Sequence, residues 1–289
     1  MVEIGCGKGD FLLLLSELGR NRGIGIDPTY LPGRNDGSAS GNVTFIRDFY
    51  SERYAQHTGD MICCRHTLEH ISDTAAFVQT IRRAIGSKTN TLVFFELPDV
   101  ERVLHECAFW DIYYEHCSYF SLGSLARLFR ACGFEVTDLA KAYDGQYLLI
   151  EAKPANGAVS APLHNEEAVE KLSKAVDEFR SRYDQVVKHW RKKIQSIREA
   201  GQRGVIWGSS SKCVAFLKTI GISDEIEYIV DINPHRQGKY LPGSGKLIVA
   251  PSFLREYRPD VVIAMNPIYL DEIRGDLASM ELRPELTAV

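Results

Sequence analysis

The first 27 residues constrain the fold more than any other part of the chain. Residues 2–4 suit a short buried strand, a glycine-rich turn follows at residues 5–9, and an apolar helical run occupies residues 11–18. A second strand at residues 23–26 ends in Asp27. Strand, glycine turn, helix, strand and terminal carboxylate form half of a nucleotide-binding βαβ unit. The carboxylate suits a ribose diol, because an ionised acid can accept hydrogen bonds from two hydroxyls.

The spacing of the glycines indicates which nucleotide the turn binds. A dinucleotide fingerprint reads G-x-G-x-x-G/A. Here Gly5, Gly7 and Gly9 follow G-x-G-x-G, and Asp10 occupies the place of the third fingerprint glycine. Glu3 and Asp10 flank the turn with acids, which favours a cationic ligand over a pyrophosphate.

The E-x-G-x-G-x-G pattern resembles motif I of the class I S-adenosylmethionine methyltransferases. In that family the Glu and Gly residues lie against the methionine end of the cofactor. The resemblance therefore implies S-adenosylmethionine as the cofactor. It implies cofactor contacts at Glu3, Gly5, Gly7, Gly9 and Asp27.

Length and composition favour a two-domain protein that acts on a small molecule. A chain of 289 residues with 45% hydrophobic content can bury a full core, and its net charge of −4 offers no basic surface for nucleic acid. Neither a membrane-spanning run nor a signal peptide is visible, since the chain opens in a core strand. The seven cysteines form no C-x-x-C pair, so we expect reduced thiols in a cytoplasmic protein and no metal bound by them.

A Gly- and Pro-containing loop at residues 28–42 precedes a strand expected at residues 43–47. Asp48 and Phe49 come directly after this strand. In the resembled family an acid at this place accepts from the adenine amino group, and a neighbouring apolar side chain covers the ring. The resemblance thus implies both residues as cofactor contacts. A helix N-cap is the alternative for Asp48.

The strand expected at residues 61–64 runs into the string R-H-T-L-E-H. It resembles the motif that closes the cofactor pocket after the fourth strand of the same methyltransferases. Ligands of open α/β sheets bind at this edge, beyond the carboxyl ends of the strands. We expect Arg65 and His66 to contact the cofactor and His70 to contact the substrate. Either histidine alone would more often be structural.

Periodicity predicts the remaining elements of this half. We expect helices at residues 73–85 and 121–132 and strands at residues 91–96, 134–140 and 146–152. The segment from Leu97 to Tyr119 has no simple period.

Residues 113–121 read YYEHCSYFS. They resemble the Y-x-E-H-x-S-Y-F-S segment of the sugar C-methyltransferases that act on nucleotide-linked keto-deoxysugars. Methylating carbon requires removal of a proton α to a carbonyl, so a base of near-neutral pKa must lie beside the sugar. His116 suits that role, and Glu115 or Tyr113 can orient a ring or hold the developing enolate oxygen. Alternatively, His116 satisfies a buried backbone carbonyl, and we expect Tyr119 and Phe120 to belong to the core.

A linker at residues 154–163 and a polar helical stretch at residues 165–200 precede a second domain that starts at Gly204. Strands are expected at residues 205–207, 226–230 and 261–264, with a helix through Ile220. The serine-rich turn at residues 208–212 has hydroxyls and a lysine at a helix start, which would hold a diphosphate. No Walker loop is present.

The second half also resembles the C-terminal domain of the sugar C-methyltransferases, through this turn and the N-P-x-x-x-G-x-Y-L-P-G string at residues 233–243. There a second Rossmann-like lobe binds the nucleotide part of the sugar. The substrate contacts that the resemblance and this chemistry imply are Ser209, Ser211, Lys212, Asp231, Asn233, Arg236, Lys239, Tyr240 and Asn266.

We therefore expect an α/β protein in three parts. Residues 1–153 form an N-terminally truncated S-adenosylmethionine-binding domain with a class I methyltransferase sheet, 154–203 a linker and long helix, and 204–289 a smaller Rossmann-like domain. The family usually opens with a cysteine-rich zinc-binding domain and helices that cover the cofactor. This chain begins at the first strand, so zinc would belong only to that missing domain. Residues 282–289 show no convincing final strand.

Three other functions fit parts of the pattern. The cofactor could serve an oxygen, nitrogen or non-sugar acceptor. Two Rossmann lobes could belong to a NAD(P)-dependent oxidoreductase, which Asp10 disfavours. A non-catalytic binding protein would result from loss of the N-terminal domain.

Overall fold

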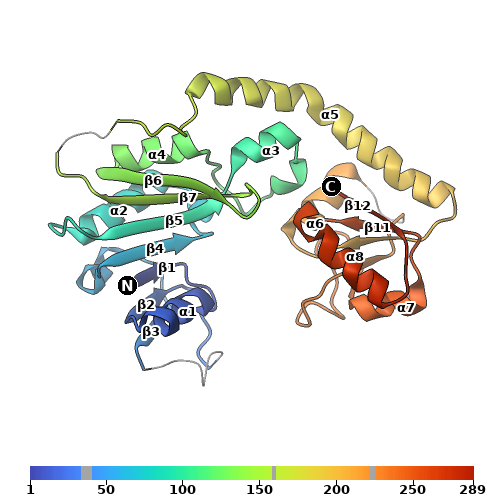
Figure 1. Cartoon of the computed structure of the whole chain (residues 1–289), viewed down its shortest axis with the longest axis horizontal. Helices are drawn as coiled ribbons and strands as arrows, with labels where there is room; N and C mark the ends of the chain where they lie inside the picture. The colour runs from blue at the N-terminus through green and yellow to red at the C-terminus, as the bar shows by residue number, and fades with distance from the viewer. Residues whose placement is uncertain (34–40, 158–160, 222–224) are drawn as a thin grey trace. The chain divides into compact units, whose positions relative to one another are not determined.

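The computed structural model describes residues 1–33, 41–157, 161–221 and 225–289. Parts of the predicted loop (34–40) and linker (158–160) lie outside these ranges. The chain forms two compact units (Figure 1). The first contains Met1–Arg102 and Glu115–Ser173, and the second contains Val103–Tyr114 and Lys174–Val289.

The first unit is built on a seven-stranded sheet of order β3-β2-β1-β4-β5-β7-β6. Strands β1 to β5 are parallel, whereas β7 is antiparallel to both β5 and β6. The strand order reverses between β1 and β4, so the carboxyl ends of these two strands border the crevice where open α/β sheets bind ligands. The strands are β1 (Val2–Ile4), β2 (Gly23–Ile26), β3 (Val43–Ile46), β4 (Met61–Arg65), β5 (Leu92–Pro98), β6 (Phe134–Ala142) and β7 (Tyr147–Pro154).

Helices cover both faces of this sheet (Figure 1). Val78 and Ile81 of α2 (Thr74–Ile85) and Phe129 of α4 (Leu122–Ala131) share one core with the strands. Leu12 of α1 (Asp10–Gly19) is fully buried outside that core, on the other face. The expected helices and strands of residues 1–153 are confirmed to within a few residues at their ends.

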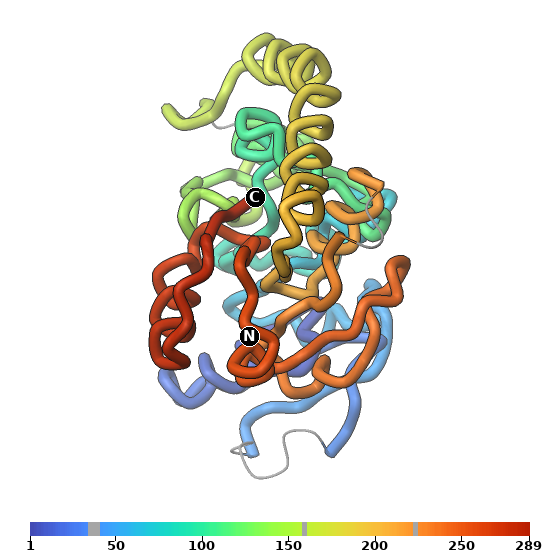
Figure 2. Tube along the Cα trace, turned by 90° about the vertical axis from the view of Figure 1, so that its right-hand side faces the viewer, coloured from blue at the N-terminus to red at the C-terminus, as the bar shows by residue number. Residues whose placement is uncertain are grey.

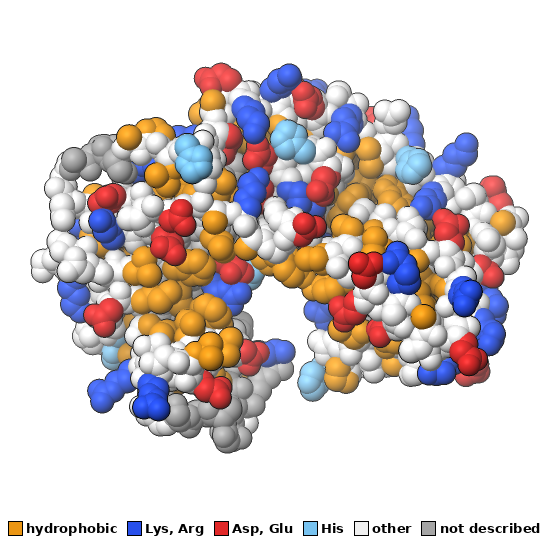
Figure 3. All heavy atoms as spheres, in the orientation of Figure 1, with side chains coloured by type: hydrophobic (Ala, Val, Ile, Leu, Met, Phe, Trp, Pro, Cys, Tyr) orange, Lys and Arg blue, Asp and Glu red, His pale blue; other side chains and the backbone are white. Residues whose placement is uncertain are grey.

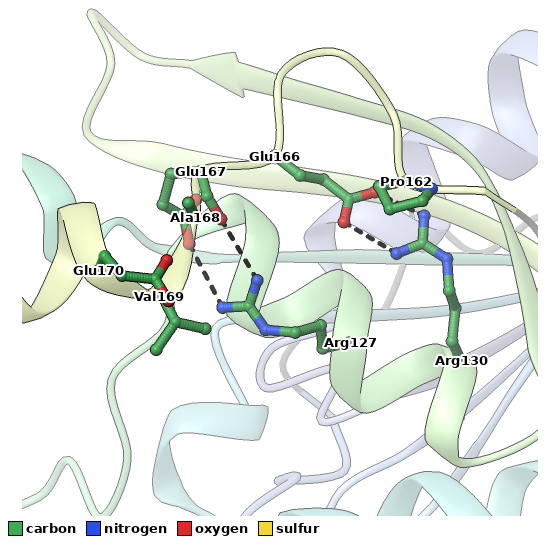
Figure 4. A pocket seen from close by; sticks show the side chains of 8 residues that line it. All are labelled: Arg127, Arg130, Pro162, Glu166, Glu167, Ala168, Val169 and Glu170. Atoms are coloured by element: carbon green, nitrogen blue, oxygen red, sulfur yellow. Dashed lines mark hydrogen bonds and ion pairs between the residues drawn. The ribbon is translucent and has the colours of Figure 1, made fainter.

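Glu166 and Glu167, which precede the helix that begins at Val169, bind side chains and backbone of α4 (Figure 4). Glu167 accepts from the Ser121 hydroxyl at 2.5 Å and from the Gly123 N–H at 2.8 Å, which satisfies the helix N-terminus. Arg130 donates to both carboxylate oxygens of Glu166, at 2.8 and 2.5 Å. An open pocket of about 520 Å³ lies among these residues and contains none of the predicted site residues. We interpret these contacts of Glu166 and Glu167 with α4 as structural.

The second unit contains a parallel five-stranded sheet of order β10-β9-β8-β11-β12. Its strands are β8 (Gly204–Trp207), β9 (Tyr228–Val230), β10 (Leu247–Val249), β11 (Val261–Ala264) and β12 (Glu285–Ala288). Its helices include α6 (Ser211–Ile220), α7 (Leu254–Tyr257) and α8 (Leu270–Ser279). The order reverses between β8 and β11, as it does between β1 and β4 in the first sheet. The two-sheet α/β fold class is thus confirmed.

The expectation that residues 282–289 form no final strand is wrong. All four residues of β12 pair in parallel with β11. This edge strand has the sequence ELTA, and its side chains are only partly buried. Four residues of mixed polarity give too weak a pattern for periodicity to detect, so the pairing depends on the exposed edge of β11.

Helix α5 (Val169–Glu199) is one continuous helix, as Figure 2 shows. Its Trp190 packs in the core of the second unit, where Phe109 and Trp110 contact Phe216 of α6. Phe109 and Trp110 belong to the segment that lacks a simple period in the sequence. This segment contains α3 (Val100–Glu106) and a short 3-10 turn (Phe109–Asp111), and from Val103 to Tyr114 it belongs to the second unit. Its side chains serve the second core, so they do not follow the pattern of the first sheet.

Candidate functional site

The turn after β1 is shaped by its glycines. Gly5, Gly7 and Gly9 have φ values of 72°, 52° and 85°, in the left-handed region. A Cβ at Gly5 would lie 1.9 Å from the Thr67 hydroxyl, whereas a Cβ at Gly7 would meet nothing within 4 Å. Gly5 therefore allows close packing inside the fold, and the backbone at Gly7 borders open space that a ligand can enter.

Asp27 is held beside this turn by three hydrogen bonds. Its Oδ2 accepts from the Gly7 N–H at 2.8 Å, and its Oδ1 accepts from the Thr29 N–H at 2.7 Å and the Thr29 hydroxyl at 2.6 Å. A carboxylate offers about four acceptor positions, so capacity remains for a ligand hydroxyl. The sequence prediction missed Thr29, although an Asp followed two residues later by Thr is a signal for such a turn.

Glu3 lies under the turn, in the middle of β1, and is 3% exposed. Its Oε2 is buried without a hydrogen-bond partner among the residues that the structure describes. Burial raises the pKa of Glu3 to about 7, and Asp27 and Asp10 add to this rise while Arg65 opposes it. A buried acid with an unsatisfied oxygen, near a turn with open space, fits a cationic ligand.

Arg65 and His66 share Glu96 as their partner. Arg65 ends β4 directly opposite Glu96 of β5, and its guanidinium donates to the two carboxylate oxygens at 3.1 and 2.9 Å. The guanidinium also lies over the Phe11 ring, 4.1 Å from its centroid. His66 Nε2 is 2.8 Å from Glu96 Oε1. Sequence reasoning missed Glu96, an acid inside an otherwise β-branched and aromatic strand.

This arrangement makes His66 a cation. Burial lowers its pKa, but the interactions with the carboxylates of Glu69 and Glu96 outweigh burial and raise the pKa to about 9. The pKa of Glu96 falls to about 2, since its bonds to His66 and Arg65 outweigh its own burial. His66 also has φ 47°, which is uncommon outside glycine. The end of β4 therefore presents fixed charges at the ligand-binding edge of the sheet.

The rings of His70 and His116 lie next to each other after β4. Their rings lie 5.0 Å apart between centroids in an edge-on arrangement. The segment that carries His116 is tied to the short turn after β4, because the Cys117 N–H donates to the Glu69 carbonyl at 2.7 Å. His70 Nδ1 is 2.8 Å from the Glu115 carbonyl oxygen.

Other predicted residues of this half have different surroundings. The side chain of Glu115 is exposed, Phe120 is buried as expected, and Tyr113 belongs to the second unit. Asp48 pairs with Arg53 and accepts from the Tyr54 hydroxyl, and it does not cap a helix, because Ser51 is the N-cap of the next turn. Phe49 is 74% exposed, so its ring is available to a ligand.

In the second unit, Ser209, Asp231, Asn233 and Arg236 form one group. Asp231 accepts from the Ser209 N–H at 3.0 Å, from the Ser209 hydroxyl and from the Asn233 N–H at 2.8 Å. Arg236 lies 3.4 Å from Asp231. These bonds lower the pKa of Asp231 although burial opposes them.

The remaining predicted residues of the second unit are less closely grouped. Lys212 pairs with Asp111 at 2.9 Å, a partner that the sequence did not suggest. Asn266 accepts from the Ile268 N–H at 3.2 Å and caps a 3-10 turn (Pro267–Tyr269). Lys239 and Tyr240 are exposed, and Ser211 opens α6. Among the described residues, no helix has the length and apolarity that crossing a membrane requires.

Comparison with known proteins finds two family models that match this chain. Residues 1–139 match the family model described as a methyltransferase domain, and residues 148–283 match the one described as a C-methyltransferase C-terminal domain. The C-methyltransferase NovU of Streptomyces niveus is 29% identical to this chain in an alignment 294 residues long. The alignment covers 94% of this chain and 67% of that protein.

Two solved structures also match part of the chain. A putative S-adenosylmethionine-dependent methyltransferase from Listeria monocytogenes is 14% identical with a TM-score of 0.40, over 54% of this chain and 90% of its own. The N,N-8-amino-8-demethyl-D-riboflavin dimethyltransferase of Streptomyces davawensis is 20% identical with a TM-score of 0.44, over 53% of this chain and 49% of its own.

Proposed function

We propose that this chain, which belongs to the S-adenosylmethionine-dependent C-methyltransferases, methylates a carbon atom of a nucleotide-linked keto-deoxysugar. The observation that carries the proposal is the pairing of His116 with His70 at the end of β4, in the unit that also holds the glycine turn and Asp27. A histidine that could serve as the base then belongs to the same sheet edge as the residues proposed to bind the cofactor.

The first unit would hold the cofactor with the residues that its resemblance to the methyltransferases implies. The turn from Gly5 to Gly9 leaves the open space noted at Gly7, and Asp27 would accept from the ribose hydroxyls. Glu3 would become ionised beneath a cationic ligand. Asp48 and Phe49 would meet the adenine, and Arg65 and His66 would contact the amino acid end. When bound, S-adenosylmethionine supplies a methyl group activated by the positive sulfur.

His116 would act as the general base. Carbon is a poor nucleophile until its proton leaves, so the protein must provide a base and a partner for the developing oxyanion. The Glu115 carbonyl can only accept, so His70 Nδ1 carries a proton in that hydrogen bond, which fixes the orientation of the His70 ring next to His116. His70 would position the sugar, and Tyr113 or Glu115 would hold the enolate oxygen.

The second unit would bind the nucleotide part of the substrate. Asp231 with Ser209 and Asn233 would meet the nucleoside, while Lys212, Ser211 and Arg236 would face the diphosphate; Lys239, Tyr240 and Asn266 complete the proposed contacts. To bind the phosphate, Lys212 would have to contact it beside Asp111 or leave its ion pair with Asp111. The proposal places the enzyme in the cytoplasm, in agreement with seven cysteines that are all unpaired.

The test is exchange of the substrate α-proton with deuterated water, followed by NMR on a nucleotide-linked keto-deoxysugar. We expect His116→Asn to lower exchange and turnover by about 10²–10⁴-fold, with S-adenosylmethionine affinity unchanged in calorimetry. His164→Asn, at an exposed histidine before α5, is the matched control. Wild-type turnover in His116→Asn would remove His116 from the role. Methylation on oxygen or nitrogen would contradict the carbon acceptor.

A further inference from the structure

Three metal-ligating side chains converge at the end of β4. One ligand atom from each of Glu69, His70 and His116 lies within 4.8 Å of the other two. Glu69 and His70 belong to a 3-10 turn (Leu68–His70), and His116 reaches them from the segment before α4. The sequence predicted no metal ligands, because the two parts of this set lie 46 residues apart.

Glu69 is the member of the cluster that most strongly indicates a bound cation. The residue is 3% exposed, yet its Oε2 is buried without a hydrogen-bond partner in the described part of the chain. A buried, unsatisfied carboxylate oxygen is costly, and coordination of a cation is one way in which proteins satisfy such a group. The carboxylate is therefore fixed within the fold, with one of its oxygens within 4.8 Å of both imidazoles.

His70 is oriented in the way that metal-binding histidines are. A carbonyl oxygen only accepts, so the 2.8 Å contact between His70 Nδ1 and the Glu115 carbonyl requires a proton on Nδ1. The Nε2 atom of the neutral ring then carries the lone pair. A backbone carbonyl on the non-ligating nitrogen is a common outer-shell partner of metal-bound histidine, and it fixes the tautomer.

We propose that Glu69, His70 and His116 bind a divalent transition-metal ion, with Zn²⁺ as the best match to two imidazoles and one carboxylate. Zinc bond lengths of about 2.0–2.2 Å place neighbouring ligand atoms roughly 3.3–3.5 Å apart. The cluster must therefore contract slightly, which small rotations of the exposed His70 and half-buried His116 side chains allow. The fourth position stays open.

A positively charged neighbour, His66, limits the affinity of the site, whereas Arg65 is held by Glu96. His66 Nδ1 lies 3.7 Å from Glu69 Oε1, and Arg65 is bound to Glu96. His66 keeps its 2.8 Å contact with Glu96 if Glu69 turns toward a metal, so its charge stays paired. Metal occupancy would take the lone pair that His116 needs as a base, so zinc would inhibit methyl transfer. That consequence rests on the proposed function, whereas metal binding does not.

The test is calorimetric titration of the whole chain with zinc chloride, without cofactor or substrate. We expect one saturable site, and more than about tenfold weaker binding in Glu69→Gln and in His70→Ala. His164→Ala is the matched control and should bind zinc as the wild type does. Unchanged affinity in the two ligand variants would overturn the proposal, provided that S-adenosylmethionine titration shows them to be folded.

A second measurement uses the wild-type chain, so it does not depend on the folding of variants. Binding of paramagnetic Co²⁺ should shift or broaden the ring resonances of His70 and His116 and leave those of His164 unaffected. Cys117 is exposed and adjacent to His116, so Cys117→Ser is titrated in parallel. The wild-type chain with Co²⁺ would show a thiolate charge-transfer band if Cys117 bound the metal. Loss of both this band and metal binding in Cys117→Ser would assign the metal to the cysteine, and the proposal would fail.

Discussion

Asp27 and Asp231 are held by matching backbone hydrogen bonds, each in its own sheet. Each follows the second strand of its sheet, and each Oδ1 accepts from the N–H two residues later, Thr29 at 2.7 Å and Asn233 at 2.8 Å. Each Oδ2 accepts from a backbone N–H of the preceding turn, Gly7 at 2.8 Å and Ser209 at 3.0 Å. The two sheets therefore present equivalent carboxylates at their ligand-binding edges.

This correspondence predicts a crossed pair of effects. Asp27→Asn should weaken S-adenosylmethionine binding by about 1.5–3 kcal/mol, the contribution of hydrogen bonds to a charged group, and leave nucleoside diphosphate binding unchanged. Asp231→Asn should do the reverse. Calorimetry with both ligands on both variants measures this, and each variant is the control for the other. Equal weakening of both ligands by one substitution would contradict the division of roles.

The ion pair between Lys212 and Asp111 predicts substitutions of opposite sign. Lys212→Ala should weaken nucleoside diphosphate binding, because the cation proposed for the phosphates is gone. Asp111→Asn should strengthen it several-fold, because the carboxylate that now competes for Lys212 loses its charge. Titration with a nucleoside diphosphate checks both. Weaker binding in Asp111→Asn would show that Asp111 positions Lys212 and does not compete with phosphate.

His66 is expected to remain protonated at neutral pH. Its ring resonances should titrate with a pKa near 9 in NMR, since Glu69 and Glu96 favour the imidazolium. Glu96→Gln should bring the pKa down toward the ordinary value of 6.5. The interaction of protonated His66 with its carboxylate partners stabilises the folded state. This stabilisation is complete below the unfolded-state pKa of His66 and is lost as the pH rises through 9. A wild-type pKa below 7 would contradict the charge network, and His66→Gln identifies the resonance.

Glu3 predicts that both stability and cofactor binding depend on pH. Its raised pKa of about 7 means that the folded chain favours the protonated acid, so the unfolding free energy falls as pH rises from about 4.5 to above 7. Glu3→Gln should remove this loss, at most about 3 kcal/mol at pH 8. S-adenosylmethionine should bind more tightly as pH rises through 7 in the wild type only. Denaturant unfolding and calorimetry at pH 6 and pH 8 measure both effects.

The sequence alone determined the main helices and strands and the glycine turn of the first unit. Local patterns suffice there, because a buried parallel strand, a glycine turn and a strand-ending acid each have their own residue signature within 27 residues. The serine turn and Asp231 in the second half are local in the same sense. The position of these motifs at the carboxyl ends of strands follows from chain order and strand direction.

Tertiary structure decided which of these residues meet. Glu96 joins Arg65 and His66 through strand pairing, and Asp111 reaches Lys212 through an inserted segment whose aromatic side chains pack in the second core. Sequence separations of 30 residues for His66 and Glu96 and 101 for Lys212 and Asp111 carry no local signal. The edge strand β12 likewise depends on the backbone of β11. Pairing across such distances is set by register and packing, which no short pattern encodes.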